Sequence, residues 1–248
     1  MLAGKVRHAA PHMKLPAAVM LALTLSTQAL AVDCAAPEGT TTRGIAAQGT
    51  TARLSFLAKL LDAEGQAARR WSLVWGGVYG VGTIAQLSLT GVLSKEDQPD
   101  MYWGALSTAV GVAFTVLDPL EVMEAGPLFA RRAGTVTDAD ACQLLIEGER
   151  LLREGAEHEE FGTRWFIHAG NVVFNVAIGL ILGFGYGHWV SGLVNMGVGT
   201  AIGEGTIFSS PTNLVSGWKH YRDGAAAPKV TFHVVPTAGP GLGFVMRF

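Results

Sequence analysis

Charge is scarce in this sequence. Asp, Glu, Lys and Arg together make up 15% of its 248 residues, against about 25% in an average soluble domain. The formal net charge is only -2, and hydrophobic residue types account for 49%. This composition excludes a disordered polyelectrolyte and a basic nucleic-acid binder. It favours an apolar chain whose principal partner is membrane lipid, and we expect no nucleic-acid partner.

Cysteine is scarce as well, since the chain contains only Cys34 and Cys142. Two thiols cannot build a disulfide-rich scaffold or a four-thiolate zinc site. In an exported protein they would meet an oxidising compartment, where thiols pair. We therefore predict a disulfide bond between Cys34 and Cys142, with two unpaired buried thiols as the alternative.

The common catalytic motifs are missing too. The sequence has no HExxH, GxSxG or CxxC motif and no P-loop. A glycine-rich run at 76–82 lacks the Lys-Ser/Thr pair and the preceding strand of a nucleotide-binding loop. The histidines are scattered and do not show the spacing of metal ligands. We therefore expect no enzyme activity, no metal site and no cofactor.

Residues 1–31 have the parts of a secretory signal. Basic residues precede an apolar stretch, Leu15–Leu25, and Ala29-Leu30-Ala31 supplies a small-residue cleavage pattern. The apolar stretch is shorter than the roughly 20 residues that a membrane span needs, which favours cleavage over an uncleaved anchor. We therefore expect an exported protein of the cell-envelope membrane, with the inner and outer membranes both open.

Two long apolar blocks, Trp71–Leu117 and Trp165–Phe208, dominate the remaining chain. The blocks align, because both contain an Arg-Trp pair before a glycine, then a tryptophan eight residues before a glycine, then an acidic residue. The landmarks are Arg70-Trp71 and Gly76 with Arg164-Trp165 and Gly170, Trp103 and Gly111 with Trp189 and Gly197, and Asp118 with Glu204. Such self-similarity indicates an internal repeat, so we predict two units, 32–134 and 135–223.

Each apolar block follows a charged stretch with leucines at helical spacing. We therefore predict an all-α membrane protein in which each unit is an amphipathic helix plus an apolar helical hairpin. The four apolar segments would form a four-helix bundle; they are 71–93, 101–118, 165–187 and 189–208. The first and third are long enough to span a bilayer, and the second and fourth are marginal. A soluble helical protein with buried hairpins is the alternative.

The tail, 224–248, has a different pattern. Apolar residues alternate with other residues from Val230 to Val234 and from Leu242 to Phe248, around a turn rich in Pro and Gly. Alternation of this kind predicts a β-hairpin. The last strand, which ends in Phe248, resembles the C-terminal strand of bacterial outer-membrane proteins. With the signal cleaved and four segments spanning, the loops at 94–100 and near His188 would face the cytoplasm. They contain one Lys and no Arg, whereas most basic residues lie in the other connecting segments, contrary to the positive-inside rule.

Glycines spaced four residues apart run along the apolar segments. Small residues at this spacing let helix backbones approach closely in lipid. We predict that they pack helices within the chain, with assembly of several copies as the alternative. The residues are Gly76, Gly80, Gly179, Gly183, Gly187, Gly199 and Gly203.

A few polar residues interrupt the apolar blocks. His168, Asn171 and Asn175 share one helix face, and Asp118 and Glu204 are the acidic residues of the four apolar segments. Polar groups in a membrane helix usually face the bundle interior and seek partners. We therefore predict one polar intramembrane cluster of these five residues. It would either fix the helix register by hydrogen bonds or contact a solute or ion.

These features predict a structural or scaffolding membrane protein of the bacterial cell envelope. Besides lipid, its expected partner is a second copy or another envelope protein. The alternative function is a small transporter or pore lined by the polar residues of the second unit.

Overall fold

The computed structural model describes residues 32–117, 121–225, 231–236 and 242–247. The predicted signal, 1–31, and Asp118 lie outside these ranges. The helices are η2 (Ile45–Ala47), α1 (Thr50–Leu89), α2 (Gln98–Leu117), α3 (Val122–Ala133), α4 (Asp138–Gly162), α5 (Trp165–Leu180), the π-helical turn η3 (Ile181–Gly185), α6 (Trp189–Phe208) and α7 (Asn213–Asp223). The fold is predominantly helical, in agreement with the predicted all-α class.

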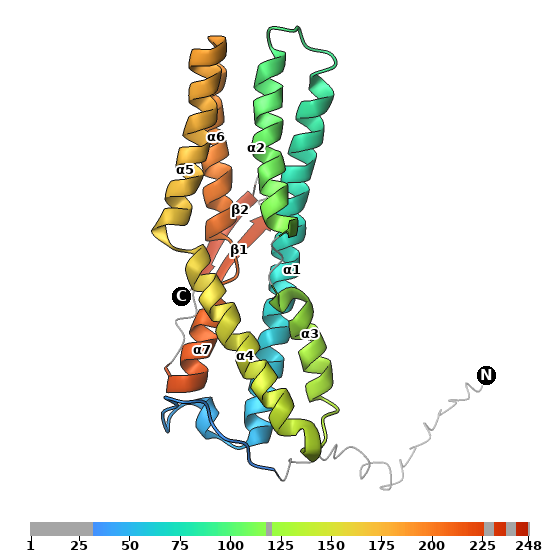
Figure 1. The fold of residues 1–248 in the computed structure, drawn as a ribbon, viewed down its shortest axis with the longest axis vertical. Helices are drawn as coiled ribbons and strands as arrows, with labels where there is room; N and C mark the ends of the chain where they lie inside the picture. The colour runs from blue at the N-terminus through green and yellow to red at the C-terminus, as the bar shows by residue number, and fades with distance from the viewer. Residues whose placement is uncertain (1–31, 118–120, 226–230, 237–241, 248) are drawn as a thin grey trace, which may run out of the picture.

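The helices form an elongated bundle with two halves (Figure 1). The start of α1, together with α3, α4 and α7, makes one half, and we call residues 32–70, 121–162 and 211–225 the disulfide half. The end of α1, together with α2, α5 and α6, makes the apolar half, residues 71–117 and 165–208. Only α1 runs through both; its 40 residues correspond to about 60 Å of helix.

The apolar core lies in the disulfide half. Leucines at helical spacing on α1 and α4 face one another there, and side chains of α3 and α7 close the core. The large core side chains that are almost fully buried are Leu57, Leu61, Phe129, Leu145, Leu152 and Leu214. The charged stretches before the apolar blocks are therefore amphipathic helices, and burial of their leucine faces holds this half together.

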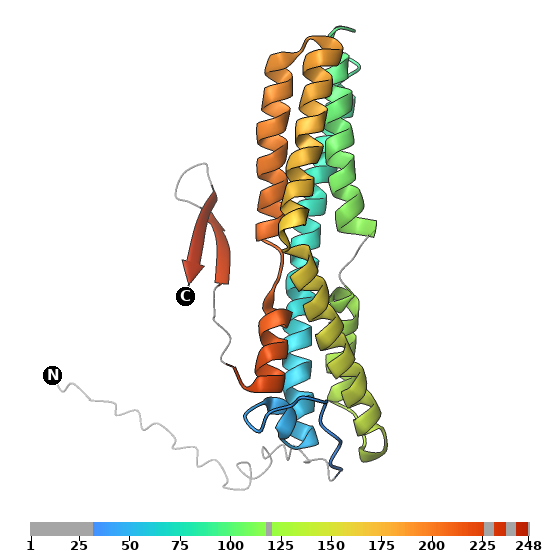
Figure 2. The same cartoon turned by 60° about the vertical axis from the view of Figure 1, so that its left-hand side comes forward.

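The apolar half has the opposite distribution. Among the described residues, only Ala105, Ile178 and Leu182 of the buried hydrophobic side chains lie in this half. By contrast, all of the large exposed hydrophobic side chains except Leu128, Ile146 and Phe161 belong to it. Figure 2 shows its helices running nearly parallel along the long axis of the molecule.

One segment of the described chain, Trp165–Gly185, is long and apolar enough by itself to cross a membrane. Its most apolar window has a mean hydropathy of 1.8, and 28% of that window is buried. The sequence analysis expects four apolar segments in the bundle. The other three share its exposed apolar surface, but they do not combine sufficient length with sufficient hydropathy.

The order of elements repeats along the chain. In both predicted units a helical hairpin is followed by a short helix, α3 or α7, that packs back on the long amphipathic helix, α1 or α4. These short helices were not predicted. The first unit also differs from expectation, because its amphipathic and apolar helices are the single helix α1. In the second unit α4 ends at Gly162, and Thr163 and Arg164 separate it from α5; glycine and threonine are weak helix formers.

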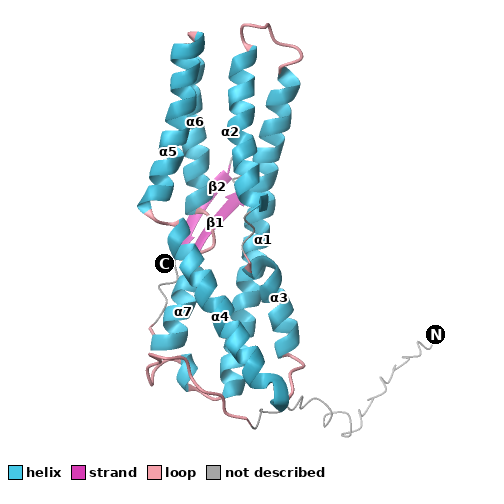
Figure 3. Ribbon diagram, in the orientation of Figure 1, coloured by secondary structure: helices cyan, strands magenta, loops and turns pink. Residues whose placement is uncertain are grey.

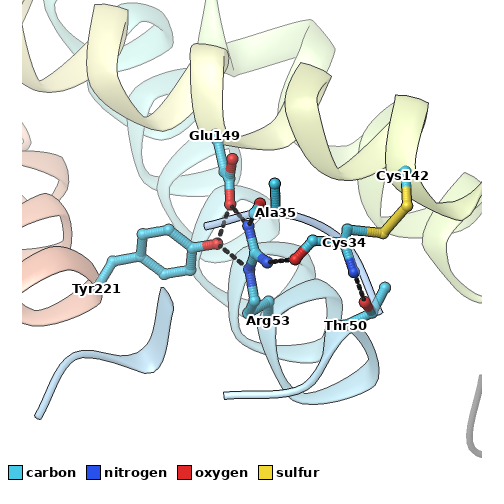
Figure 4. The surroundings of a disulfide bond; sticks show 7 residues. All are labelled: Cys34, Ala35, Thr50, Arg53, Cys142, Glu149 and Tyr221. Atoms are coloured by element: carbon cyan, nitrogen blue, oxygen red, sulfur yellow. Dashed lines mark hydrogen bonds and ion pairs between the residues drawn. A yellow bond between two sulfur atoms is a disulfide. The ribbon is translucent and has the colours of Figure 1, made fainter. Parts of the chain in front are cut away.

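The disulfide bond between Cys34 and Cys142 is present, with the two Cα atoms 5.4 Å apart. This confirms the prediction. The bond fastens the segment before α1 to the start of α4 (Figure 4).

Beside the disulfide, the guanidinium of Arg53 is buried, and each of its three nitrogens donates a hydrogen bond. It donates to the carbonyl oxygens of Cys34 and Ala35 at 2.7 and 2.9 Å, to the Tyr221 hydroxyl at 3.1 Å, and to the Glu149 carboxylate. Tyr221 also donates to Glu149, and burial together with this contact raises the pKa of Tyr221. One buried cation thus joins the N-terminal segment, α1, α4 and α7.

The tail contains two short strands, β1 (Thr231–Pro236) and β2 (Leu242–Arg247). They pair antiparallel, with Thr231 opposite Arg247 and Pro236 opposite Leu242. Figure 3 shows them as the strand pair of an otherwise helical structure.

Loss of the disulfide should destabilise the disulfide half. The double variant Cys34→Ser/Cys142→Ser removes a cross-link between residues 108 positions apart, and native disulfides of this kind contribute about 2–4 kcal/mol. Near-ultraviolet circular dichroism should show a lower melting temperature for the variant than for the oxidised wild type. Wild type in reductant should melt at the same temperature as the variant. Equal melting of the variant and the oxidised wild type would contradict the role assigned to the bond.

Candidate functional site

Four of the five predicted cluster residues meet between α5 and α6. Glu204 of α6 lies opposite the polar face of α5, where His168 Nδ1 is 2.5 Å from its Oε2. Asn171 donates from Nδ2 to Glu204 Oε1 at 2.9 Å and to the Thr200 carbonyl oxygen at 3.1 Å. Both carboxylate oxygens of Glu204 therefore have partners on α5. We call His168, Asn171, Asn175 and Glu204 the polar network.

Asn175 extends the network towards the middle of the bundle. Its Nδ2 donates to both the carbonyl oxygen and Oδ1 of Asn171, at 2.9 Å each. Its own Oδ1 accepts a long hydrogen bond, 3.5 Å, from Ser107 of α2. The Asn175 side chain is only 2% exposed. The network thus links three helices and becomes more enclosed with distance from Glu204.

Two glycines of α6 make room for the asparagines. An ideal Cβ on Gly199 would lie 2.0 Å from Asn175 Oδ1, and one on Gly203 would lie 2.1 Å from Asn171 Oδ1. Any larger residue would occupy the space of a hydrogen-bonding side chain. The spacing of four residues between these glycines matches the spacing of the two asparagines on α5. Each asparagine therefore fills the space left by one glycine, and we call each such space a glycine notch.

Further along the hairpin, the two helix backbones themselves approach. A Cβ on Gly179 would lie 2.6 Å from the carbonyl oxygen of Gly192, and one on Gly183 would lie 2.6 Å from the Trp189 ring. Gly192 was not among the predicted packing residues. Close approach of α5 and α6 therefore depends on small residues along the whole hairpin.

Two of the glycines predicted to pack helices have open surroundings within the chain. A Cβ on Gly80 would meet nothing within 4 Å, because that side of α1 is open. Gly187 also has open surroundings; its φ of +78° instead lets the chain turn between α5 and α6. Gly76 has only an ordinary contact, 3.5 Å from Thr115 Oγ1.

A second histidine–carboxylate pair, which was not predicted, lies at the other end of the apolar half. His188 Nδ1 is 2.7 Å from Asp100 Oδ1, which joins the turn before α6 to the first turn of α2. His188 interrupts the second apolar block in the sequence, but nothing in the sequence identifies Asp100 as its partner. Asp118, the fifth predicted cluster residue, lies outside the described residues.

Hydroxyl and indole groups connect α1 to the same bundle. Tyr79 and Thr206 share a hydrogen bond of 2.8 Å, and Trp71 donates from its indole nitrogen to the Thr206 carbonyl oxygen at 3.2 Å. Thr83 and Thr108 meet at 2.8 Å between α1 and α2. Contacts of this kind fix the position of one helix along its axis relative to the next helix.

The polar network can fix helix register more readily than it can hold a cofactor or metal. Within the described part of the chain, no three His, Cys, Asp or Glu side chains lie close enough to hold a metal ion. The oxygens and nitrogens of the asparagines are already engaged with one another and with Glu204. His168 and Glu204 are 26% and 24% exposed, so this end of the network is shielded but not sealed.

Comparison with known proteins adds no family to this description. No protein-family model matches the chain, and the curated proteins and solved structures compared with it give no match either.

The glycine notches can be tested with a matched pair of substitutions on α6. Gly203→Ala should displace Asn171 and destabilise the protein by about 1–3 kcal/mol, as overpacking does. Gly197→Ala is the control, because a Cβ there meets nothing within 4 Å and alanine is the better helix former. Unfolding in detergent, followed by tryptophan fluorescence, compares them. Equal stability of the two variants would contradict the notch.

Proposed function

We propose that this protein is an exported cell-envelope membrane protein with a structural or scaffolding role and without enzyme activity. Its apolar half would lie in the bilayer, and its disulfide half would stand in the oxidising compartment beside it. Residues 1–31 would be the cleaved signal, and 32–134 and 135–223 would be two copies of one unit. Membrane lipid would be the first partner, and a second copy or an envelope protein the next.

The main support for this proposal is that large apolar side chains are buried in the disulfide half but exposed in the apolar half. Val81, Phe114 and Val190 are 69%, 71% and 78% exposed on three different helices of the apolar half. A continuous exposed apolar surface is unfavourable in water and marks contact with a membrane or protein. The surface surrounds the bundle on helices from both hairpins, which fits a bilayer better than a partner docked on one face.

The dimensions also support a bilayer. Trp165–Gly185 has 21 residues, about 31 Å of helix at about 1.5 Å per residue, close to the roughly 30 Å of the hydrocarbon core. Trp71 and Trp165 lie where the apolar surface begins, as interfacial aromatic residues do. Polar residues at 94–100 lie at the opposite end, in the turn before α2 and in its first residues.

The closed hydrogen bonding of the polar network favours a structural role over a pore. Asn171 and Asn175 fill notches at Gly203 and Gly199, and their polar atoms bond within the protein. A polar side chain in hydrocarbon is costly without such partners. The network therefore supports fixed packing of α5, α6 and α2, with transport as the alternative that the experiments below can reveal.

Membrane insertion can be tested by labelling on opposite sides of the bilayer. Because both natural cysteines are in the disulfide, an introduced cysteine is the only free thiol. Lys95→Cys in the distal turn and Arg131→Cys in the disulfide half should react with an impermeant maleimide from opposite faces of sealed vesicles. Release of the protein by alkaline carbonate, or labelling of both sites from one face, would overturn the proposal.

A structural role and a conduction role make different predictions for Glu204. Glu204→Gln keeps a carbonyl oxygen for Asn171, so it should cost less than about 1.5 kcal/mol and still restore envelope integrity in a deletion strain. Glu204→Lys should destabilise the bundle, since it faces the donor group of Asn171 with another donor. Glu157→Lys, on the exposed surface of α4, is the control. A folded Glu204→Gln protein that fails to complement would favour transport.

A further inference from the structure

Two glutamates are buried where α1, α4 and α7 meet. Glu64 of α1 is 5% exposed, and Glu159 of α4 is 7% exposed. Both lie in the disulfide half. Buried carboxylates are rare unless they are paired or hydrogen-bonded, and the partners of these two are unequal.

Glu159 caps the N-terminus of α7 from outside that helix. Its Oε2 accepts the backbone N–H groups of Leu214 and Val215 at 2.9 and 3.1 Å. The residue before α7, Thr212, makes no side-chain capping hydrogen bond. The first N–H groups of a helix have no partner within the helix, and here a side chain of α4 supplies one.

Only one of the two carboxylate oxygens of Glu64 has a hydrogen-bond partner. Its Oε1 accepts a hydrogen bond from Asn213 Nδ2 at 2.7 Å. Its Oε2 is buried and has no hydrogen-bond partner among the described residues. A buried anionic oxygen without a partner is strongly unfavourable, whereas a neutral carboxyl group costs much less.

Few charges act on this pair. Arg70 of α1 lowers the pKa of Glu64, and α7 offers the Asn213 amide and its own backbone N–H groups. Burial outweighs these contributions and raises the pKa of Glu64. Burial together with the neighbouring charge of Glu64 raises the pKa of Glu159 to about 8. Arg70 for Glu64, and Glu64 for Glu159, are the charged groups that shift these two pKa values.

We propose that Glu64 and Glu159 form a proton-binding site whose occupancy fastens the N-terminus of α7 to α1 and α4. The charge of Glu64 acts on Glu159, so the two carboxyls titrate as a coupled pair. With one proton bound, a single negative charge remains, and Oε2 of Glu159 can still accept both N–H groups of α7. Loss of that proton leaves two buried negative charges that repel each other.

Proton binding therefore opposes detachment of α7. Detached and hydrated, Glu159 would titrate near its ordinary pKa of 4.5, whereas in place its pKa is about 8. The detached form thus loses its proton first as the pH rises. By linkage, the opening equilibrium grows by up to about tenfold per pH unit between these two values and then levels off. Docking of α7 is strongest at low pH.

Hydrogen exchange at the α7 amides tests this coupling directly. We expect the protection factors of Leu214 and Val215, in the full-length protein in detergent, to fall by about three- to tenfold per pH unit between pH 5.5 and 7.5. Glu64→Gln/Glu159→Gln keeps the shape of both side chains but removes the titration, so its protection should be independent of pH. Glu160→Gln, exposed on the same helix, should keep the wild-type slope.

A second measurement keeps the test decisive if the double variant does not fold. Carbon-13 NMR of glutamate-labelled wild type reads the carboxyl titrations without substitution. One carboxyl step with a pKa between about 7 and 9, shifted or removed in either single glutamine variant, is the expected result. All carboxyls titrating below pH 6, or an unchanged pH slope in the folded double variant, would overturn the proposal.

Discussion

The continuity of α1 is the constraint on which the rest of the structure depends. Its first turns carry Arg53 and the leucines of the core, and its later turns carry Tyr79 and Thr83 of the apolar half. No Gly or Pro interrupts it between Gly65 and Gly76, where the two halves join. Backbone hydrogen bonds therefore run through the junction without a break. Every other helix is placed in one half by its contacts with α1 or with a helix that touches it.

Both halves gather hydrogen-bond partners around a charged side chain. Buried polar groups are costly without partners, and in each half one charged side chain joins several helices through the donors or acceptors around it. In the disulfide half the centre is Arg53, held by two carbonyl oxygens, Tyr221 and Glu149. In the apolar half it is Glu204, held by His168 and Asn171. Each joins helices that are distant in the sequence.

Much of this could be predicted because local periodicity and burial are linked. The leucine spacing on α1 and α4 indicates their core faces, and the shared helix face of His168, Asn171 and Asn175 indicates a common partner. The break between α4 and α5 has no counterpart in the continuous α1. The weak helix formers Gly162 and Thr163 explain it, but their importance is clear only when the two units are compared. The disulfide followed from two cysteines and an expected oxidising compartment.

What the sequence could not provide was pairing between distant segments. Asp100 lies in a charged turn, and its contact with His188 depends on how two hairpins align at their tips. The burial of Glu64 and Glu159 was also missed, because both lie in charged stretches where glutamates are normally solvated. Only the packing of α7 against α1 and α4 encloses them. The short helices α3 and α7 lack the long apolar period that identifies the others.

The junction between α4 and α5 has a mechanical consequence. The chain leaves the helical conformation at Thr163 and resumes it after Arg164, so no rigid rod joins the halves on that side. A continuous helix such as α1 resists bending along its whole length. A tilt of one half against the other would therefore require α1 to bend, whereas the connection between α4 and α5 could change its backbone angles at Thr163 and Arg164.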